Sequence, residues 1–431
     1  MARPDPGRFA PVWVVLFVAL WPIPGIAATV LSLSSLYALW LGFRHRRSGW
    51  NELLGWSGVR LTVLLFLAYW LPQLISIPDA LDRPLALAKS AGDLRYLPFM
   101  LLCAVAVSTP RRRAVTFNGL ALIGLVWVLD ALLQVALGFS PVFWALDQLK
   151  WLSSGHGFCS AEEVAAVDRL SGILGPCNLK FGQTLASLSA FLLFAAGKRS
   201  RMAWLLVVLA LAAVLALAGS RASWITFGLI ALFSGWGLLG GRKLLGLLLL
   251  GIGLAAGLTM VSPQLQQRVQ RTTMAFHGGA DGVNQALSGR SDIWEAALCM
   301  IRQHPINGVG TRGFREAWPA CNPHPGQLQV WGEGAALHAH QLVLEILTET
   351  GVIGLLLWLV GVVLAWRAWR AAGSQLRAQA RPAMVALVST LFPLNTHLAV
   401  YSSFWGGLTL MLVGLFAGAI DRNYSDLPAD V

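Results

Sequence analysis

Two histidines stand directly before one of the most apolar segments of the chain, in the stretch LHAHQLVLEILTETGVIG (residues 337–354). The positive end of a helix dipole lowers the pKa of an imidazole, and a neutral imidazole accepts a proton from an alcohol. Because His340 precedes the apolar segment, it is predicted to act as a general base on a hydroxyl group. His338 would face the same side if the segment is extended. The alternative is an interfacial histidine that makes one backbone hydrogen bond.

Metal chemistry is the other use of a His-x-His pair, with His324 as a possible third zinc ligand. No carboxylate or cysteine stands at a spacing that completes such a site, so neither a metal nor any other cofactor is predicted. Asp-x-Asp is absent from the sequence, which argues against a metal-dependent sugar transferase. Carboxylates remain the rival choice for the base, because SIPDALDRPLALAKSAGD holds Asp79, Asp82 and Asp93.

Arginines in short polar stretches could bind an anion. Arg221 is the only charge in AGSRASW, between two apolar segments, where a guanidinium needs an anionic partner or a watery cavity. Arg290 in LSGRSDIW precedes a predicted helix, whose free N–H groups suit a phosphate. The alternatives are a snorkelling interface residue and an exposed loop residue. Further cations that could enlarge this field are Lys180, Arg268, Arg271, Arg312 and Arg315.

Apolar helices must position these residues. Of the 431 residues, 56% are hydrophobic and 12% charged, and an apolar run of about 20 residues spans the ~30 Å core of a bilayer. The sequence predicts an all-α polytopic membrane protein, one transmembrane domain over residues 1–431 with about 12 transmembrane helices. The first run is interpreted as a retained helix, since no clean cleavage site follows it. The runs are roughly 10–24, 26–43, 58–77, 94–108, 115–137, 178–196, 203–219, 222–239, 243–261, 342–366, 383–398 and 403–420. Glu345 and Glu349, inside the tenth run, are expected to pair internally or to line a cavity.

Lys and Arg gather in alternate connections, which indicates the cytoplasmic side of the membrane. These connections include RHRRSGWNE, TPRRR, GKRSR, GGRK and WRAWRAAGSQLRAQAR, and both tails join them. Both termini are therefore predicted to be cytoplasmic. The long loops 138–177 and 263–341 are predicted to be periplasmic, in the inner membrane of a Gram-negative-type cell. The net charge of +12 follows largely from this topology, and no nucleic-acid motif accompanies it.

The two external loops are expected to contain short helices and disulfides. Helices are predicted at SAEEVAAVDRL, at 263–276 and at 291–303, and the segment from there to about residue 336 is predicted to be irregular. Four of the five cysteines fall in these loops, on the oxidising side, which indicates two disulfides. Three pairings are possible, and the two most local bridges are preferred. They are Cys159–Cys177 and Cys299–Cys321.

Several motifs together resemble the O-antigen ligase and O-antigen polymerase superfamily. SGRSDIWEAALCMIRQHPINGVGTRGF (288–314) is similar to its Ser-Gly-Arg start, His-Pro turn and Gly-Val-Gly exit. HQLVLEILTETGVIG (340–354) resembles the ligase pattern of His, a polar residue, nine residues and Gly. SRASWI (220–225) is similar to an Arg-x-x-x-Leu element, with Ile in the last place, and GPCNLKFG (175–182) resembles a Gly-Pro-Asn turn with a cysteine inserted.

The resemblance implies a GT-C-like glycosyltransferase that needs no metal and inverts the anomeric carbon. The implied donor is O-antigen polysaccharide on undecaprenyl pyrophosphate, and the implied acceptor is lipid A–core oligosaccharide at the periplasmic face. Both would reach the site sideways from the membrane lipids. His340 would be the base, and Arg221 and Arg290 would bind the pyrophosphate. Further possible substrate-binding residues are His338, Lys180, Arg268, Arg312 and Asn178.

Three alternatives stay open. An O-antigen polymerase would use the same donor with a second lipid-linked glycan as acceptor. A protein O-oligosaccharyltransferase would use a serine or threonine side chain. A transporter of lipid-linked glycans would predict charges along a path through several helices, whereas the charges here gather on one face.

Overall fold

The computed structural model describes residues 5–23, 25–44, 50, 53–166, 169–261, 279–327, 331 and 334–421, with residues 266, 270, 273, 274 and 277 between them. Within these residues every regular element is a helix, which confirms the all-α prediction. Arg268 and Arg271 lie outside the described residues, as does most of the predicted helix 263–276.

Each of the twelve apolar runs overlaps a helix. Among the described residues, six of these helices are long and apolar enough to cross a membrane, namely α2, α3, α6, α10, α11 and α17, and α1 and α19 are shorter apolar helices. The crossing of the membrane by all twelve therefore stays a prediction. The helices are α1 (Ala10–Ala19), α2 (Ile26–Arg44), α3 (Trp56–Ser76), α5 (Tyr96–Val105), α6 (Pro110–Leu137), α9 (Phe181–Arg199), α10 (Arg201–Ala218), α11 (Arg221–Leu239), α12 (Gly241–Val261), α17 (Leu342–Ala371), α18 (Ser374–Thr390) and α19 (Ser403–Ala419).

Shorter elements occupy the connections. The predicted helices of the loops are present as α8 and α15, and α7 was not predicted. The segment after residue 303, predicted to be irregular, contains α16, so that prediction is wrong for Phe314–Cys321. These elements are η2 (Ile77–Asp79), α4 (Arg83–Asp93), α7 (Pro141–Ser154), α8 (Ala161–Ala166), η3 (Gly172–Leu174), α14 (Gly279–Ala286), α15 (Arg290–Gln303) and α16 (Phe314–Cys321).

Two helices form the centre of the bundle. In α9 every residue from Phe181 to Leu193 is buried, because α6, α10, α11 and α18 pack around it. In α19, Gly414 and Gly418 let the backbone of α5 approach closely. A Cβ at Gly414 would lie 2.7 Å from the carbonyl oxygen of Met100, and one at Gly418 would touch that of Ala104. Small residues four positions apart are typical of close helix contacts in membranes.

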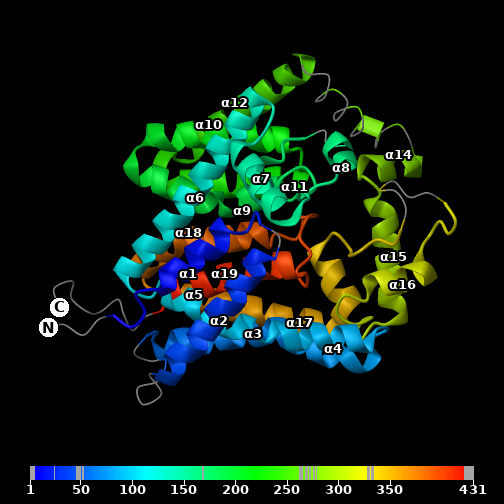
Figure 1. Ribbon diagram of the computed structural model, residues 1–431, viewed down its shortest axis with the longest axis horizontal. Helices are drawn as coiled ribbons and strands as arrows, with labels where there is room; N and C mark the ends of the chain where they lie inside the picture. Colours follow the sequence, from blue (N-terminus) through cyan, green and yellow to red (C-terminus); the bar gives the residue numbers. More distant parts are fainter. Residues whose placement is uncertain are drawn as a thin grey trace.

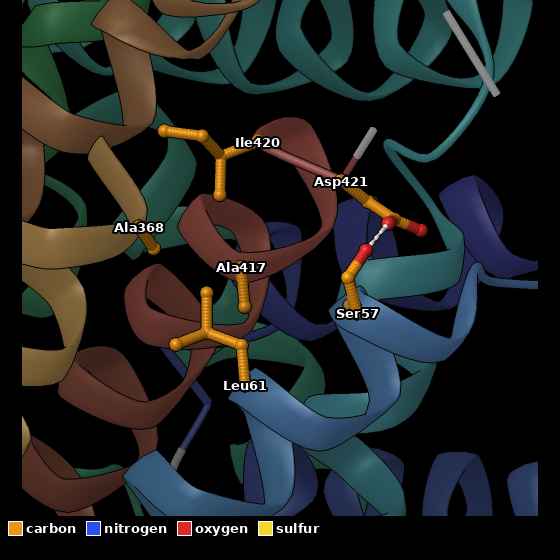
Figure 2. A pocket seen from close by; sticks show the side chains of 7 residues that line it. Ser57, Leu61, Ala368, Ala417, Ile420 and Asp421 are labelled. Atoms are coloured by element: carbon orange, nitrogen blue, oxygen red, sulfur yellow. Dashed lines mark hydrogen bonds between the residues drawn. The ribbon is translucent and has the colours of Figure 1, made fainter. Parts of the chain in front are cut away.

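The described ends of the chain lie together at one end of the bundle. Asp5 forms an ion pair with Arg112 in the first turn of α6, and Asp421, after α19, accepts a hydrogen bond from Ser57 at the start of α3. We call this the terminal end. A cavity of about 180 Å³ lies there, and Figure 2 shows Ser57 and Asp421 beside its apolar lining. Helices α4, α15 and α16 lie at the opposite end (Figure 1), where α17 begins; we call this the site end.

Both predicted disulfides are present at the cysteines expected. Cys159 and Cys177 have Cα atoms 5.4 Å apart, and Cys299 and Cys321 have Cα atoms 5.7 Å apart. The first bridge joins the loop before α8 to the turn before α9. The second ties α15 to α16, so it holds the helix that begins with Arg290 to the irregular segment that leads back to α17.

Candidate functional site

His340 lies just before α17, in a geometry that assigns the roles of its ring nitrogens. Its φ is +51°, and the next residue, Gln341, caps α17 by accepting a hydrogen bond from the N–H of Leu344. The ring Nδ1 of His340 lies 3.2 Å from the carbonyl oxygen of Thr396. A carbonyl only accepts, so Nδ1 carries the proton and Nε2 keeps a lone pair. That lone pair is what a general base requires.

The imidazole of His340 is neutral at physiological pH. Burial, and then the nearby Arg290 charge, lower its pKa to about 4. The sequence predicts this direction but a different cause, the dipole of α17. The rings of His338 and His340 lie against each other on the same side, as expected for an extended segment, with centroids 3.8 Å apart and planes tilted by 40°. Burial, followed by His340 and Arg312, holds the pKa of His338 well below its usual value.

Arg221 and Arg290 are brought together at the starts of two helices. The guanidinium of Arg221, the first residue of α11, donates to the carbonyl oxygen of Ala286. That of Arg290, the first residue of α15, donates to the adjacent carbonyl of Leu287 at 3.4 Å. Burial, and next the charge of Arg221, lower the pKa of Arg290. Among the described residues neither guanidinium pairs with a carboxylate, so both positive charges remain available to an anion.

The Ser-Gly-Arg motif forms a tight turn before α15, with two consecutive residues in the left-handed backbone region. Ser288 and Gly289 both have positive φ, +58° and +78°, and the N–H of Gly289 donates to the carbonyl of Asn284. The side chain of Asn284 accepts from the hydroxyl of Ser291 and donates to the carboxylate of Asp292. Gly289 therefore allows the sharp entry into α15, and Asn284 keeps it rigid.

The His-Pro and Gly-Val-Gly motif packs against a break in α17. Gly351 interrupts the helix with φ +65° and ψ −167°, and the carbonyls just before the break pair with the motif instead. The N–H of Val309 donates to Thr348 at 2.8 Å, and the N–H of Val352 donates to the carbonyl of Pro305 at 2.9 Å. A Cβ on Gly351 would collide with the carbonyl of Ile306. Two motifs that are separated in sequence thus form one structural unit around the break in α17, the helix that follows His340.

Glu345 and Glu349, which were expected to pair internally or to line a cavity, accept hydrogen bonds from the backbone of loops that pack against α17. Both are fully buried. Glu345 accepts hydrogen bonds from the backbone N–H groups of Val400 at 3.2 Å and Tyr401 at 3.3 Å. Glu349 accepts from the N–H of Arg312 at 2.8 Å. Since each carboxylate has a backbone partner, its role is to position loops.

The carboxylates that rivalled His340 have structural partners. Asp79 accepts from the side chain of Asn307, and Asp82 caps α4. Asp93 pairs with Lys89 one turn earlier in α4.

Among the described residues, no group of three or more His, Cys, Asp or Glu side chains is arranged to hold a metal ion. His324, the supposed third zinc ligand, has its Nε2 3.9 Å from Asp292.

A third histidine, His397, belongs to this cluster and was missed by the sequence reasoning. The predicted run 383–398 passes through it, but α18 ends at Thr390, so His397 lies in a loop. Burial first, and then the neighbours His340, Arg290, Arg169 and Lys180, lower its pKa to about 3. The polar sequence PLNTH, with its proline, was the available sign that the helix ends earlier.

Of the remaining predicted substrate-binding residues, Lys180 and Arg312 lie close enough to the histidines to affect their pKa values. Lys180, directly before α9, places its ammonium 4.7 Å from the ring centroid of Phe404, and its charge acts on His397. Arg312 has φ +67° and acts on His338. Asn178 has a buried side-chain oxygen without a hydrogen-bond partner among the described residues. Arg268 cannot be compared, since it lies outside the described residues.

Within the described residues, the fold and site define a class of protein: its regular elements are helices, six of them are long and apolar enough to cross a membrane, and neutral imidazoles lie at one end with Arg221 and Arg290. Residues 205–359, from α10 into α17, match the family model described as O-antigen ligase (Wzy_C). A curated relative is the exopolysaccharide production protein ExoQ of Rhizobium meliloti (strain 1021), 29% identical over 114 residues. That match covers 23% of this chain and spans only 24% of the length of the relative.

Proposed function

We propose that this protein is an O-antigen ligase. It would transfer O-antigen polysaccharide from undecaprenyl pyrophosphate to a hydroxyl of lipid A–core oligosaccharide, at the periplasmic face of the inner membrane and without a metal. The observation that carries the proposal is the pairing of Arg221 and Arg290, both without a carboxylate partner, beside the neutral His340. All three residues lie within the part of the chain that matches the O-antigen ligase family.

The proposed chemistry is a single displacement. Nε2 of His340 accepts the proton of the acceptor hydroxyl, and the oxygen attacks the anomeric carbon of the donor sugar. The bond from that carbon to the pyrophosphate oxygen breaks, and undecaprenyl pyrophosphate leaves with the electron pair. Arg221 and Arg290 stabilise the charge that grows on the leaving group, which is the part of the reaction that fixed positive charges assist most. One displacement inverts the anomeric carbon.

The orientation in the membrane is part of the proposal. Basic residues lie at the ends of three helices: those of TPRRR at the start of α6, Lys198 and Arg199 at the end of α9, and Arg367 and Arg370 near the end of α17. Arg112 and Ala368 show that these ends of α6 and α17 lie at the terminal end of the bundle. Positive charge favours the cytoplasmic side. Both termini would thus be cytoplasmic and the site end periplasmic, with loops 138–177 and 263–341 outside.

A polymerase is the second candidate function. The relative ExoQ is named for exopolysaccharide production, which favours an acceptor that is itself a lipid-linked glycan. The chemistry at His340 would be unchanged, because only the source of the attacking hydroxyl differs.

The deciding experiment uses purified full-length protein in lipid, with O-antigen on undecaprenyl pyrophosphate and lipopolysaccharide that lacks O-antigen. A ligase yields banded lipopolysaccharide in the presence of EDTA. A polymerase lengthens the donor glycan when no lipopolysaccharide is present. Transport of the donor across the vesicle membrane with no new glycosidic bond would contradict both candidates.

A further inference from the structure

The loop between α18 and α19, residues 391–402, is held rigidly against the start of α17. Its carbonyls at Pro393 and Thr396 accept hydrogen bonds from Gln341 at 3.2 Å and His340 at 3.2 Å. Its N–H groups at Val400 and Tyr401 donate to Glu345. A loop tied at both ends to the element that carries the proposed base has a defined geometry, and its other side chains are positioned with it.

His397 is the side chain that this loop presents to the charged groups of the site. Its backbone N–H donates to Asn395 at 3.1 Å, and its ring packs edge-on against the buried Trp405, with centroids 5.8 Å apart. Its ring nitrogens form no hydrogen bond with any residue that the structure describes, although the residue is half-buried. Because the ring is only partly buried, its nitrogens remain accessible to water or to a ligand.

The charges that surround His397 indicate the sign of that partner. Arg290 and Lys180 come from the starts of α15 and α9, and Arg169 from the segment before η3; the charge of each acts on the His397 ring. Cations from three separate segments thus lie near one neutral imidazole, and they, with His340, are the groups whose charge affects the ring most. This arrangement favours an anionic ligand with several acceptor oxygens, such as a diphosphate.

We propose that the loop 391–402 forms a wall of the donor site and that His397 donates a hydrogen bond to the diphosphate of the donor, on the side opposite its contact with Trp405. This inference rests on the proposed function, because it takes the diphosphate-linked donor as the ligand. It extends the site beyond the family match, which ends at residue 359. His340 and His397 then have different tasks: one accepts a proton from the acceptor, and the other binds the leaving group.

Binding of inorganic pyrophosphate to the purified full-length protein, measured by calorimetry, tests the inference without a transfer reaction. His397→Ala should weaken binding about tenfold, the usual effect of losing one hydrogen bond to a charged group. His397→Gln retains an N–H donor of similar reach and should bind within about threefold of the unmodified protein. His156→Ala, in an exposed loop, is the matched control and should leave the affinity unchanged.

Arg290→Ala separates this inference from the proposed function. If the unmodified protein and Arg290→Ala bind pyrophosphate equally poorly, the diphosphate-linked donor itself is wrong. If Arg290→Ala loses binding and His397→Ala does not, only the role of His397 is wrong.

A transfer assay excludes a merely structural role of the ring. Loss of a donor contact should raise the KM for the donor about tenfold and leave kcat within about threefold. A fall in kcat at unchanged KM, with Gln no better than Ala, would overturn the inference, because it would mean that the ring only supports the contact between Thr396 and His340.

Discussion

Arginines at the two ends of the bundle differ in what they contact. At the terminal end, Arg112 is 5% exposed, forms an ion pair with Asp5, and donates to carbonyls of Leu53 and Val105. At the site end, Arg221 and Arg290 contact only carbonyls among the described residues, and their side chains reach solvent. A charge near an apolar interior needs an opposite charge or water. Because Arg221 and Arg290 have no carboxylate partner among the described residues, we expect them to bind an anionic ligand.

The carboxylates show the same contrast. At the terminal end, Asp421 is buried and its partner is the hydroxyl of Ser57, within a small apolar cavity (Figure 2). At the site end, Glu345 and Glu349 accept hydrogen bonds from backbone N–H groups, and neither forms an ion pair with Arg221 or Arg290. At the terminal end, polar groups therefore pair with one another and stabilise the fold. At the site end, Arg221 and Arg290 have no carboxylate partner among the described residues, and we expect an anionic ligand to supply the negative charge.

The largest effect is expected from His340. His340→Ala should reduce kcat about a thousandfold, since a general base contributes roughly 10²–10⁴ to a rate. His340→Gln retains a donor for the carbonyl of Thr396 but supplies no basic nitrogen, so it should lose as much. Transfer rates of both variants in lipid, at saturating donor and acceptor, provide the measurement. A Gln variant near the normal rate would mean that His340 only positions the loop.

The arginines provide the direct comparison of the two ends. Arg290→Ala should reduce the rate about a hundredfold, because a fixed cation at the leaving group is lost. Arg290→Lys should recover part of this rate, since the charge returns without the planar fork of donors. Arg112→Ala should instead lower the free energy of unfolding by about 1.5–3 kcal/mol and leave the rate of the folded protein within about twofold. Rates and thermal midpoints are measured on the same preparations. Equal rate losses at Arg112 and Arg290 would abolish the distinction between the ends.

The sequence predicted the helices better than their ends. Apolar runs are long because the hydrocarbon core is thick, so each of them marks a helix without reference to its neighbours. The run 383–398 was misplaced because the first turns of α18 are basic and lie outside the apolar stretch, whereas PLNTH beyond its end looked like part of it. The break at Gly351 left no sign in an apolar run that contains other glycines.

The site was predictable only where a residue carries its own signal. Arg221 and Arg290 were found because charges are rare in such surroundings, and His340 because it precedes a long apolar segment. His397 was missed because its significance depends on its electrostatic interactions with His340 and Arg290, which no local pattern encodes. Spacing along the chain cannot show that Arg221, at the start of α11, and Arg290, at the start of α15, donate to the neighbouring carbonyls of Ala286 and Leu287.

An intermediate effect is expected at the break in α17. Gly351→Ala puts a Cβ against the carbonyl of Ile306 at a positive φ that alanine adopts only with strain. The 304–313 segment should shift, and the rate should fall about tenfold as His340 moves slightly from its productive position. Gly58→Ala, which meets the side chain of Asp421 at the terminal end, is the control and should change the thermal midpoint but not kcat. A rate change at Gly58 as large as that at Gly351 would argue against a specific link between the break and the base.

The smallest effect concerns pH. A base must be unprotonated, so activity that depends on His340 is present above its pKa and lost as the pH falls through it. With a pKa of about 4 in the free protein, kcat/KM should vary less than about twofold between roughly pH 6 and 8. Arg290 helps to lower that pKa, so Arg290→Gln should move the acidic limb of the residual activity to higher pH. Arg112→Gln, at the terminal end, removes a positive charge that does not act on His340 and should leave the limb in place. A limb that moves equally in both variants would show that the net charge of the protein, and not the charge beside the imidazole, sets the acid dependence.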